Sequence, residues 1–222
     1  MTWIIMIGIM VLSFIIQNVL QSRFRKYSKV GLTNGMSGAE VAQKMLRENG
    51  IYDVQVVPTK GMLTDHYDPR TKTVALSEGV FASRSVAAAA IAAHECGHAI
   101  QHAYGYGPLR MRSALVPVVN FASNIVQWVL LAGVLLIKIF PGLLLLGIGL
   151  FAITTFFSFI TLPVEINASK RAVTWLADAG ITDDKTRPMA IDALKWAAYT
   201  YVIAALGSLA TLFYYIGLSR RN

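Results

Sequence analysis

The architecture of this chain follows from residues 115–162, which read LVPVVNFASNIVQWVLLAGVLLIKIFPGLLLLGIGLFAITTFFSFITL. The stretch holds two apolar blocks, 115–137 and 143–162, and neither block contains a charged side chain. A helix needs roughly 20 mostly apolar residues to cross the hydrocarbon core of a bilayer. Each block meets that length, and the loop between them is short. The stretch therefore predicts a transmembrane hairpin that returns the chain to the side it left.

Two more apolar blocks, residues 2–20 and 197–218, are also free of charge and long enough to span a bilayer. Only 14% of all residues are charged, whereas soluble domains carry about 25%. The first block lacks the basic start of a signal peptide, and no small-residue cleavage site precedes Gln21, which favours a retained anchor. We predict a mainly α-helical integral membrane protein with about four transmembrane helices.

The polar segments 21–114 and 163–196 hold 17 of the 20 Lys and Arg residues. Four spans place both segments on one side of the membrane, and the positive-inside rule assigns that side to the cytoplasm. The formal net charge of +8 is spread over loops, and no nucleic-acid motif is present. We therefore expect the lipid bilayer, and no nucleic acid, as a partner.

The first polar segment is expected to form a small α+β unit. Ser37 and Glu40 have the spacing of a capping box, and the helix that they begin should end at Gly50. Two strand-like runs follow, 54–57 and 73–76, whose pairing the sequence leaves open. The second run is either an edge strand that binds an extended substrate or an ordinary strand that covers a helix.

Helix-forming residues fill positions 86–93, and Gly105 ends the pattern, which predicts one helix over 85–104. His94 and His98 lie within it at positions i and i+4. These positions share one face of a helix, so the two imidazoles can bind the same tetrahedral metal ion.

Glu95 completes the pattern H-E-x-x-H, in which the glutamate is the catalytic residue. Zinc lowers the pKa of a bound water to about 7, and Glu95 would accept a proton from that water as general base. If the residues of this motif were only core residues, the buried Glu95 carboxylate would have no partner, which costs several kcal/mol. This cost disfavours a purely structural role for the motif. The single Cys96 excludes an internal disulfide and fits a reducing compartment.

A catalytic zinc site needs a third protein ligand, and Glu165 is the best candidate. It follows the third span directly, on the predicted side of His94, and is the only carboxylate between Glu95 and Asp178. An acid at the mouth of a transmembrane hairpin is a candidate for function. Tyr104 stands where a metzincin pattern requires its third histidine, which excludes that class.

Pro163 is expected to end the third span, so that a separate helix covers 164–179 and stops at Gly180. Thr182 or Asp183 should then cap a helix that continues into the fourth span.

Two histidines remain alternatives to Glu165 as the third ligand. His102 lies one turn beyond His98 on the same helix, where ligation would be strained, so a supporting or solvated position is favoured. His66 lies in a polar loop and is either a ligand or a hydrogen-bond donor. Donors are also needed for the oxyanion of the transition state, and His66, Tyr67 and Arg171 are the candidates.

Several stretches together resemble one known family. They are AAHECGHAIQH at 92–102, LTDHYDPR at 63–70, and LPVE at 162–165 followed by Ala168-Ser169 and Arg171-Ala172. Over nearly its whole length the chain is similar to the bacterial membrane zinc metallopeptidases of the YugP type. The resemblance implies a small protein of the bacterial inner membrane with peptidase activity and no known substrate.

A more distant similarity, to the Ste24/HtpX-type membrane proteases, implies a glutamate ligand on a later helix. In that group an aspartate commonly follows the ligand by four residues, a position that Ser169 occupies here. Either Asn167 or Asp178 could supply the missing polar group.

The sequence thus predicts a membrane-embedded zinc endopeptidase, with a zincin-like cytoplasmic segment, that cleaves membrane or membrane-associated proteins. The alternative is a non-catalytic zinc- or peptide-binding membrane module, which would need His94 and His98 but not Glu95. A transporter would need more polar groups than the Ser, Thr, Asn and Gln residues that the spans contain. The depth of the 85–104 helix in the bilayer and the oligomeric state stay open.

Overall fold

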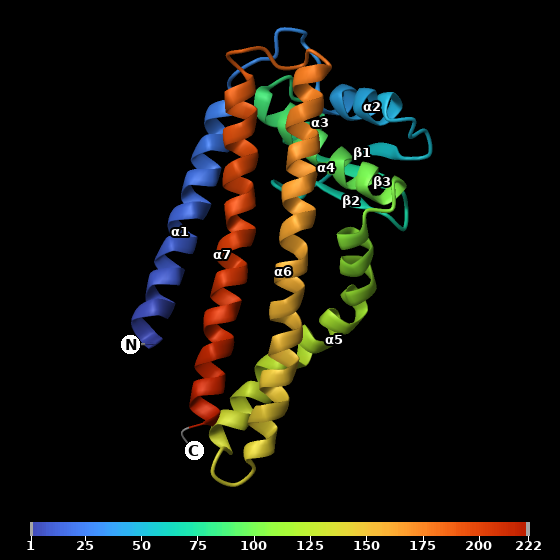
Figure 1. Cartoon of the computed structure of the whole chain (residues 1–222). Helices are drawn as coiled ribbons and strands as arrows, with labels where there is room; N and C mark the ends of the chain where they lie inside the picture. The colour runs from blue at the N-terminus through green and yellow to red at the C-terminus, as the bar shows by residue number, and fades with distance from the viewer. Residues whose placement is uncertain (1, 221–222) are drawn as a thin grey trace.

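A computed structural model describes residues 2–220, with side chains from residue 4 onward. Its framework consists of four long helices, α1 Thr2–Tyr27, α5 Gly107–Leu135, α6 Pro141–Asp178 and α7 Arg187–Ser219. All four are long and apolar enough to cross a membrane. Helices α1, α7 and α6 run side by side, and α5 pairs with α6 near their connecting turn before the two diverge (Figure 1). The prediction of a mainly α-helical chain with four candidate spans is confirmed.

A small α+β unit lies at the end of α6 that is remote from this turn (Figure 1). Its elements are α2 Gly38–Glu48, β1 Gln55–Thr59, β2 His66–Asp68, β3 Thr73–Ser77, α3 Glu78–Phe81 and α4 Val86–Ala103. Helix α2 begins with the expected capping box. The Ser37 hydroxyl accepts a hydrogen bond from the Glu40 backbone N–H, and the Glu40 carboxylate accepts one from the Ser37 backbone N–H.

Strand β3 is the middle strand of a three-stranded sheet with the order β1-β3-β2. It pairs in parallel with β1 and antiparallel with β2. Because both of its edges are paired, β3 cannot bind an extended peptide, so the edge-strand alternative for residues 73–76 is wrong. Val74 and Leu76 are instead fully buried in the core that includes α4. The edge strands are β1 and β2.

Helix α6 continues through Pro163 without a break, so the predicted helix start at Val164 is wrong. A proline inside a helix removes one backbone hydrogen bond and costs about 3 kcal/mol or more. Val164, Ala168 and Ala172 follow on this helix and are fully buried, in a region where α6 packs against α4. This tertiary packing offsets the local cost of the proline.

Helix α7 begins at Arg187 with Thr186 as its N-cap residue, so Thr182 and Asp183 are not its caps. The Asp183 carboxylate accepts hydrogen bonds from the backbone N–H groups of Lys185 and Thr186 at 3.0 and 2.8 Å. Asp183 therefore stabilises a local turn before the helix. An aspartate can accept hydrogen bonds from nearby backbone N–H groups in a turn as well as at the start of a helix.

Helices α4 and α6 approach each other closely at Gly97. A Cβ atom at this position would lie 2.8 Å from the carbonyl oxygen of Ala168, closer than real side chains come. Only glycine permits this contact without a shift of the backbone. The contact sets the separation between the helix that carries His94 and His98 and the helix that carries Glu165.

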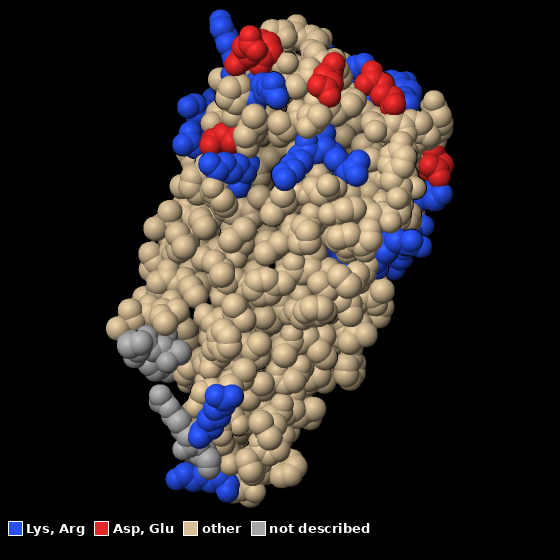
Figure 2. Space-filling model, viewed as in Figure 1, with Lys and Arg blue, Asp and Glu red and all other residues tan. Residues whose placement is uncertain are grey.

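Charged side chains gather around the end of the molecule that holds the α+β unit, whereas the belt along the long helices shows none on the visible face (Figure 2). A few basic residues mark the opposite end of the molecule. The uncharged belt coincides with the four candidate spans.

Candidate metal centre

The three predicted ligands come together from two helices. Helix α4 carries His94 and His98 one turn apart, and α6 carries Glu165 opposite them. The Oε2 atom of Glu165 lies 3.3 Å from Nε2 of His94 and 3.5 Å from Nε2 of His98. One potential ligand atom from each residue lies within 4.8 Å of the other two. This is a separation that one metal ion can bridge.

The surroundings of Glu165 test whether a metal ion fits. Its Oε2 atom is buried and has no hydrogen-bond partner among the described residues. A buried carboxylate oxygen without a partner is costly, and a cation between it and the two imidazoles would remove that cost. Imidazole nitrogen and carboxylate oxygen are both zinc ligands. The residues therefore fit a zinc ion.

The electrostatics of the centre also favour a cation. Burial by itself lowers the pKa of the His98 imidazole, but the carboxylates of Glu165 and Glu95 outweigh burial and raise it above its ordinary value. The centre therefore stabilises positive charge, whether a proton or a metal ion carries it.

A chain of hydrogen bonds fixes the orientation and the tautomer of His98. Arg171 Nε can only donate, and it donates to Oδ1 of Asn167 at 2.9 Å. The Gln101 amide nitrogen donates to the same Oδ1 atom at 3.0 Å and to the carbonyl oxygen of Val164 at 2.8 Å. Gln101 Oε1 therefore faces Nδ1 of His98, at 3.0 Å. Because this oxygen can only accept, Nδ1 carries the proton and Nε2 keeps its lone pair for a metal.

His94 is held by a different partner. Its Nδ1 atom lies 3.1 Å from the Ser169 hydroxyl, which can accept the Nδ1 proton. Ser169 thus contacts the histidine at the position where an aspartate was expected from the distant similarity. Asn167 belongs to the series of hydrogen bonds that supports His98. Asp178 lines a separate surface cavity, away from the centre.

Replacing Gln101 with Leu is expected to weaken zinc binding by about 10- to 100-fold, as loss of such supporting partners commonly does. The leucine removes the acceptor for the Nδ1 proton, so His98 is no longer held in the metal-binding tautomer. Competition with a chromophoric chelator measures the affinity. The exposed Gln43→Leu is the matched control, and equal zinc affinity in the two variants would contradict this role of Gln101.

The centre opens into a cleft of about 690 Å³. His94, Glu95, His98 and Glu165 all contribute to its wall, and Glu95 is only 8% exposed. Strand β2 and its flanking residues form one side, one face of α5 forms another, and Tyr201 of α7 completes it. The predicted base and the three predicted ligands therefore share one cavity.

His66 and Tyr67 lie in the wall of this cleft, whereas His102 does not line it. The His66 Nδ1 atom is 2.8 Å from the carbonyl oxygen of Thr64. The Tyr67 hydroxyl is 2.8 Å from Nδ1 of His102. Burial raises the pKa of Tyr67, with a further contribution from two nearby aspartates, so its hydroxyl stays protonated at neutral pH. His102 thus supports Tyr67 and is outside the ligand group.

Arg171, a predicted donor, lies outside the cleft. The structure adds to the wall of the cleft two residues that the sequence did not indicate. Arg112 extends its guanidinium to 3.5 Å from Oε1 of Glu165. Tyr201 projects into the cleft from α7. In the sequence, Arg112 is one of several basic residues before an apolar block, and Tyr201 is one tyrosine within another block. Neither residue carries a local signal of its position at the centre.

Four apolar helices, together with two histidines and a glutamate that could hold one metal ion next to a second glutamate, are the features expected of a membrane-type zinc peptidase. Comparison with known proteins agrees with this class. Residues 2–220 match the family described as "Putative neutral zinc metallopeptidase", and the chain belongs to that family.

A curated relative extends this finding. The chain is 46% identical over 205 residues to the "Putative membrane protease YugP" of Bacillus subtilis (strain 168). The aligned region covers 92% of this chain and 90% of that protein. No solved structure matches the chain. The resemblance of the sequence motifs to the YugP-type family is confirmed.

Proposed function

We propose that this chain is a zinc-dependent endopeptidase that hydrolyses peptide bonds of membrane or membrane-associated proteins. The observation that carries the proposal is the buried Oε2 atom of Glu165, which has no hydrogen-bond partner among the described residues and faces the Nε2 atoms of His94 and His98. A zinc ion held by these three residues would polarise the scissile carbonyl and acidify a water molecule.

Glu95 is the proposed general base. Its side chain is buried, lines the cleft beside His94 and His98, and accepts no hydrogen bond within residues 2–220. An unpaired carboxylate at this place is free to accept a proton from the attacking water and to pass it to the leaving amine. A module that only binds zinc would need no such group, and this separates the two functions.

Strand β2 is the proposed binding strand for the substrate. It is an edge strand, paired on one side with β3, and its residues lie in the wall of the cleft. An extended peptide that pairs with the edge of β2 would lie along the cleft, next to the centre. His66, Tyr67, Arg112 and Tyr201 line the same cleft and are the donors available to a developing oxyanion.

The centre lies near the border between the charged end and the uncharged belt. Glu165 precedes Lys170 by five residues, or about 7–8 Å along α6 at the helical rise. This depth supports action at the membrane surface rather than in the middle of the bilayer. Residues 21–114 and 163–196, with most of the basic residues, are proposed to face the cytoplasm of a bacterial cell.

Zinc removal tests the proposed function directly. Protein purified in detergent is expected to contain about one zinc ion per chain, because the three ligands form one centre. Treatment with 1,10-phenanthroline should abolish casein cleavage, and added zinc should restore it. The non-chelating 1,7-phenanthroline is the control. Protein that lacks zinc as purified, and does not gain activity with it, would refute the proposal.

The proposed topology predicts opposite accessibility for the two ends of the molecule. In a Cys96→Ser background, a cysteine at Asp184 should be labelled by a membrane-impermeant maleimide only after cell permeabilisation. A cysteine at Lys138, in the turn between α5 and α6, should be labelled in intact spheroplasts. The reverse pattern would overturn the assignment of the cytoplasmic side. In the wild-type protein, burial raises the pKa of the Cys96 thiol. This thiol should therefore react poorly with the maleimide, both in intact and in permeabilised cells.

A further inference from the structure

A second cavity adjoins the centre on the side away from α5. It has a volume of about 210 Å³ and shares four wall residues with the cleft, namely Asp65, His94, Glu95 and Tyr201. Apart from these shared residues, its wall is almost wholly apolar, with Thr200 as the one polar exception. We refer to this second cavity as the apolar pocket.

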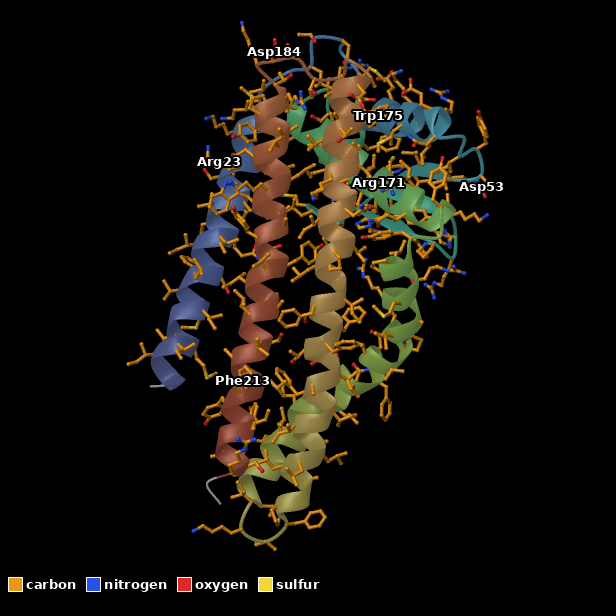
Figure 3. The ribbon with its side chains drawn as sticks, viewed as in Figure 1. Arg23, Asp53, Arg171, Trp175, Asp184 and Phe213 are labelled. Atoms are coloured by element: carbon orange, nitrogen blue, oxygen red, sulfur yellow. The ribbon has the colours of Figure 1, made fainter. Side chains whose placement is uncertain are left out.

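Three helices build the apolar pocket, each with side chains one turn apart. Leu20 and Phe24 come from α1, Ala87 and Ile91 from α4, and Ala193 and Ala197 from α7. Residues at positions i and i+4 share a helix face, so each pair forms one wall. The three alanines leave space where larger side chains would fill the junction of the helices. Beside the pocket, α1 and α7 are joined by an ion pair between Arg23 and Asp192 at 3.3 Å (Figure 3 labels Arg23).

Glu95 joins the pocket to the chemistry of the centre. It continues the row of Ala87 and Ile91 on α4 and lies in the wall of both cavities. Glu95 as a residue is only 8% exposed, and its carboxylate accepts no hydrogen bond from any residue that the structure describes. The pocket is therefore continuous with the place where the attacking water would lose its proton.

The chain segment before and within β2 runs past both cavities in order. Leu63 lines only the apolar pocket, Asp65 lines both cavities, and residues 66–70 line only the cleft. A peptide that follows this segment through the centre would have one end in the cleft and the other at the apolar pocket. The side chain nearest to the scissile bond on that side would point at the pocket.

We propose that the apolar pocket is a specificity subsite that takes one large aliphatic or aromatic side chain next to the scissile bond. This inference rests on the proposed peptidase function and adds its substrate class, which is peptide bonds flanked by residues such as Leu, Ile, Met or Phe. Away from the four residues that it shares with the cleft, the wall offers a side chain only apolar surface and Thr200, and it contains no Lys or Arg. Burial of a leucine side chain there favours binding over glycine by about 10- to 100-fold.

The test uses binding to the zinc-loaded protein, so it does not depend on turnover. Two peptide hydroxamates, which differ only in a leucyl or a glycyl side chain beside the zinc-binding group, are titrated calorimetrically into the protein in detergent. Wild type should bind the leucyl compound about 10- to 100-fold more tightly. Ala197→Phe, which fills the pocket, should bring the two affinities within about twofold of each other, because the leucyl side chain loses its site.

Ala210→Phe is the matched control, on the same helix but in a groove shared with Phe213, towards the other end of α7 (Figure 3). It should keep the wild-type preference. Ala193→Leu, a smaller change in the same pocket, should reduce the preference even if Ala197→Phe folds poorly.

Three outcomes would count against the proposal in different ways. Equal affinity of wild type for both hydroxamates would overturn the subsite and leave the zinc centre standing. Equal affinities together with a bound phospholipid that Ala197→Phe lacks would assign the pocket to an acyl chain and overturn the peptide subsite. Wild type that binds zinc but neither hydroxamate would refute the proposed function and the subsite with it.

Discussion

Replacing Glu95 with Gln is expected to lower the rate of substrate cleavage by about 100- to 10,000-fold, the usual contribution of a general base. Glutamine keeps nearly the same size and shape, but at neutral pH it cannot accept a proton from the attacking water. The zinc content should stay at the wild-type level, because His94, His98 and Glu165 are unchanged. Cleavage of casein by purified protein and zinc analysis of the same sample measure both effects.

The control for this experiment is Glu78→Gln, which removes one negative charge at an exposed position of α3. It should cleave like wild type. Full activity of Glu95→Gln would contradict the role of Glu95 as base. Zinc in both proteins with cleavage by neither would favour the alternative of a zinc- or peptide-binding module.

The second large effect is expected for Glu165→Ala, which removes the proposed third ligand. Loss of a residue that only supports a metal ligand costs about 10- to 100-fold in affinity, so loss of the ligand itself should cost about 100-fold or more. Zinc should then be lost during purification in the presence of a weak chelator. Cleavage should fall with the zinc content, because two imidazoles alone leave the centre open.

His102→Ala is the matched control, since His102 was an alternative third ligand in the sequence. In the structure it contacts Tyr67 instead and does not line the cleft. His102→Ala should therefore keep its zinc. Circular dichroism of both variants shows whether the helices are intact. Zinc loss in His102→Ala, with retention in Glu165→Ala, would reverse the ligand assignment.

The grouping of His94, His98 and Glu165 could be predicted because its signals are local or topological. The spacing of His94 and His98 places both imidazoles on one helix face in any fold that keeps this helix. Glu165 followed from the hairpin, which returns the chain to the side of His94, and from the lack of other carboxylates nearby. These inferences needed no knowledge of how α4 and α6 pack.

The residues around the ligands could not be predicted in the same way. Gln101 and Ser169 gain their contacts with the two histidines only because Gly97 lets α4 approach α6 at Ala168. Arg112 reaches Glu165 only because α5 diverges from α6 and leaves the cleft between them. Such contacts depend on the relative placement of helices, which leaves no periodic pattern in the sequence.

The order of residues was sufficient for the four apolar helices, the motif helix and the capping box of α2, because each depends on length, composition or spacing within a few turns. Tertiary packing settled the remaining features. It placed β3 in the middle of the sheet, carried α6 through Pro163, and directed Nε2 of His94 and His98 towards Glu165. Each of these results depends on contacts between residues far apart in the chain, whose free energy outweighs local preference and is not encoded in any single stretch.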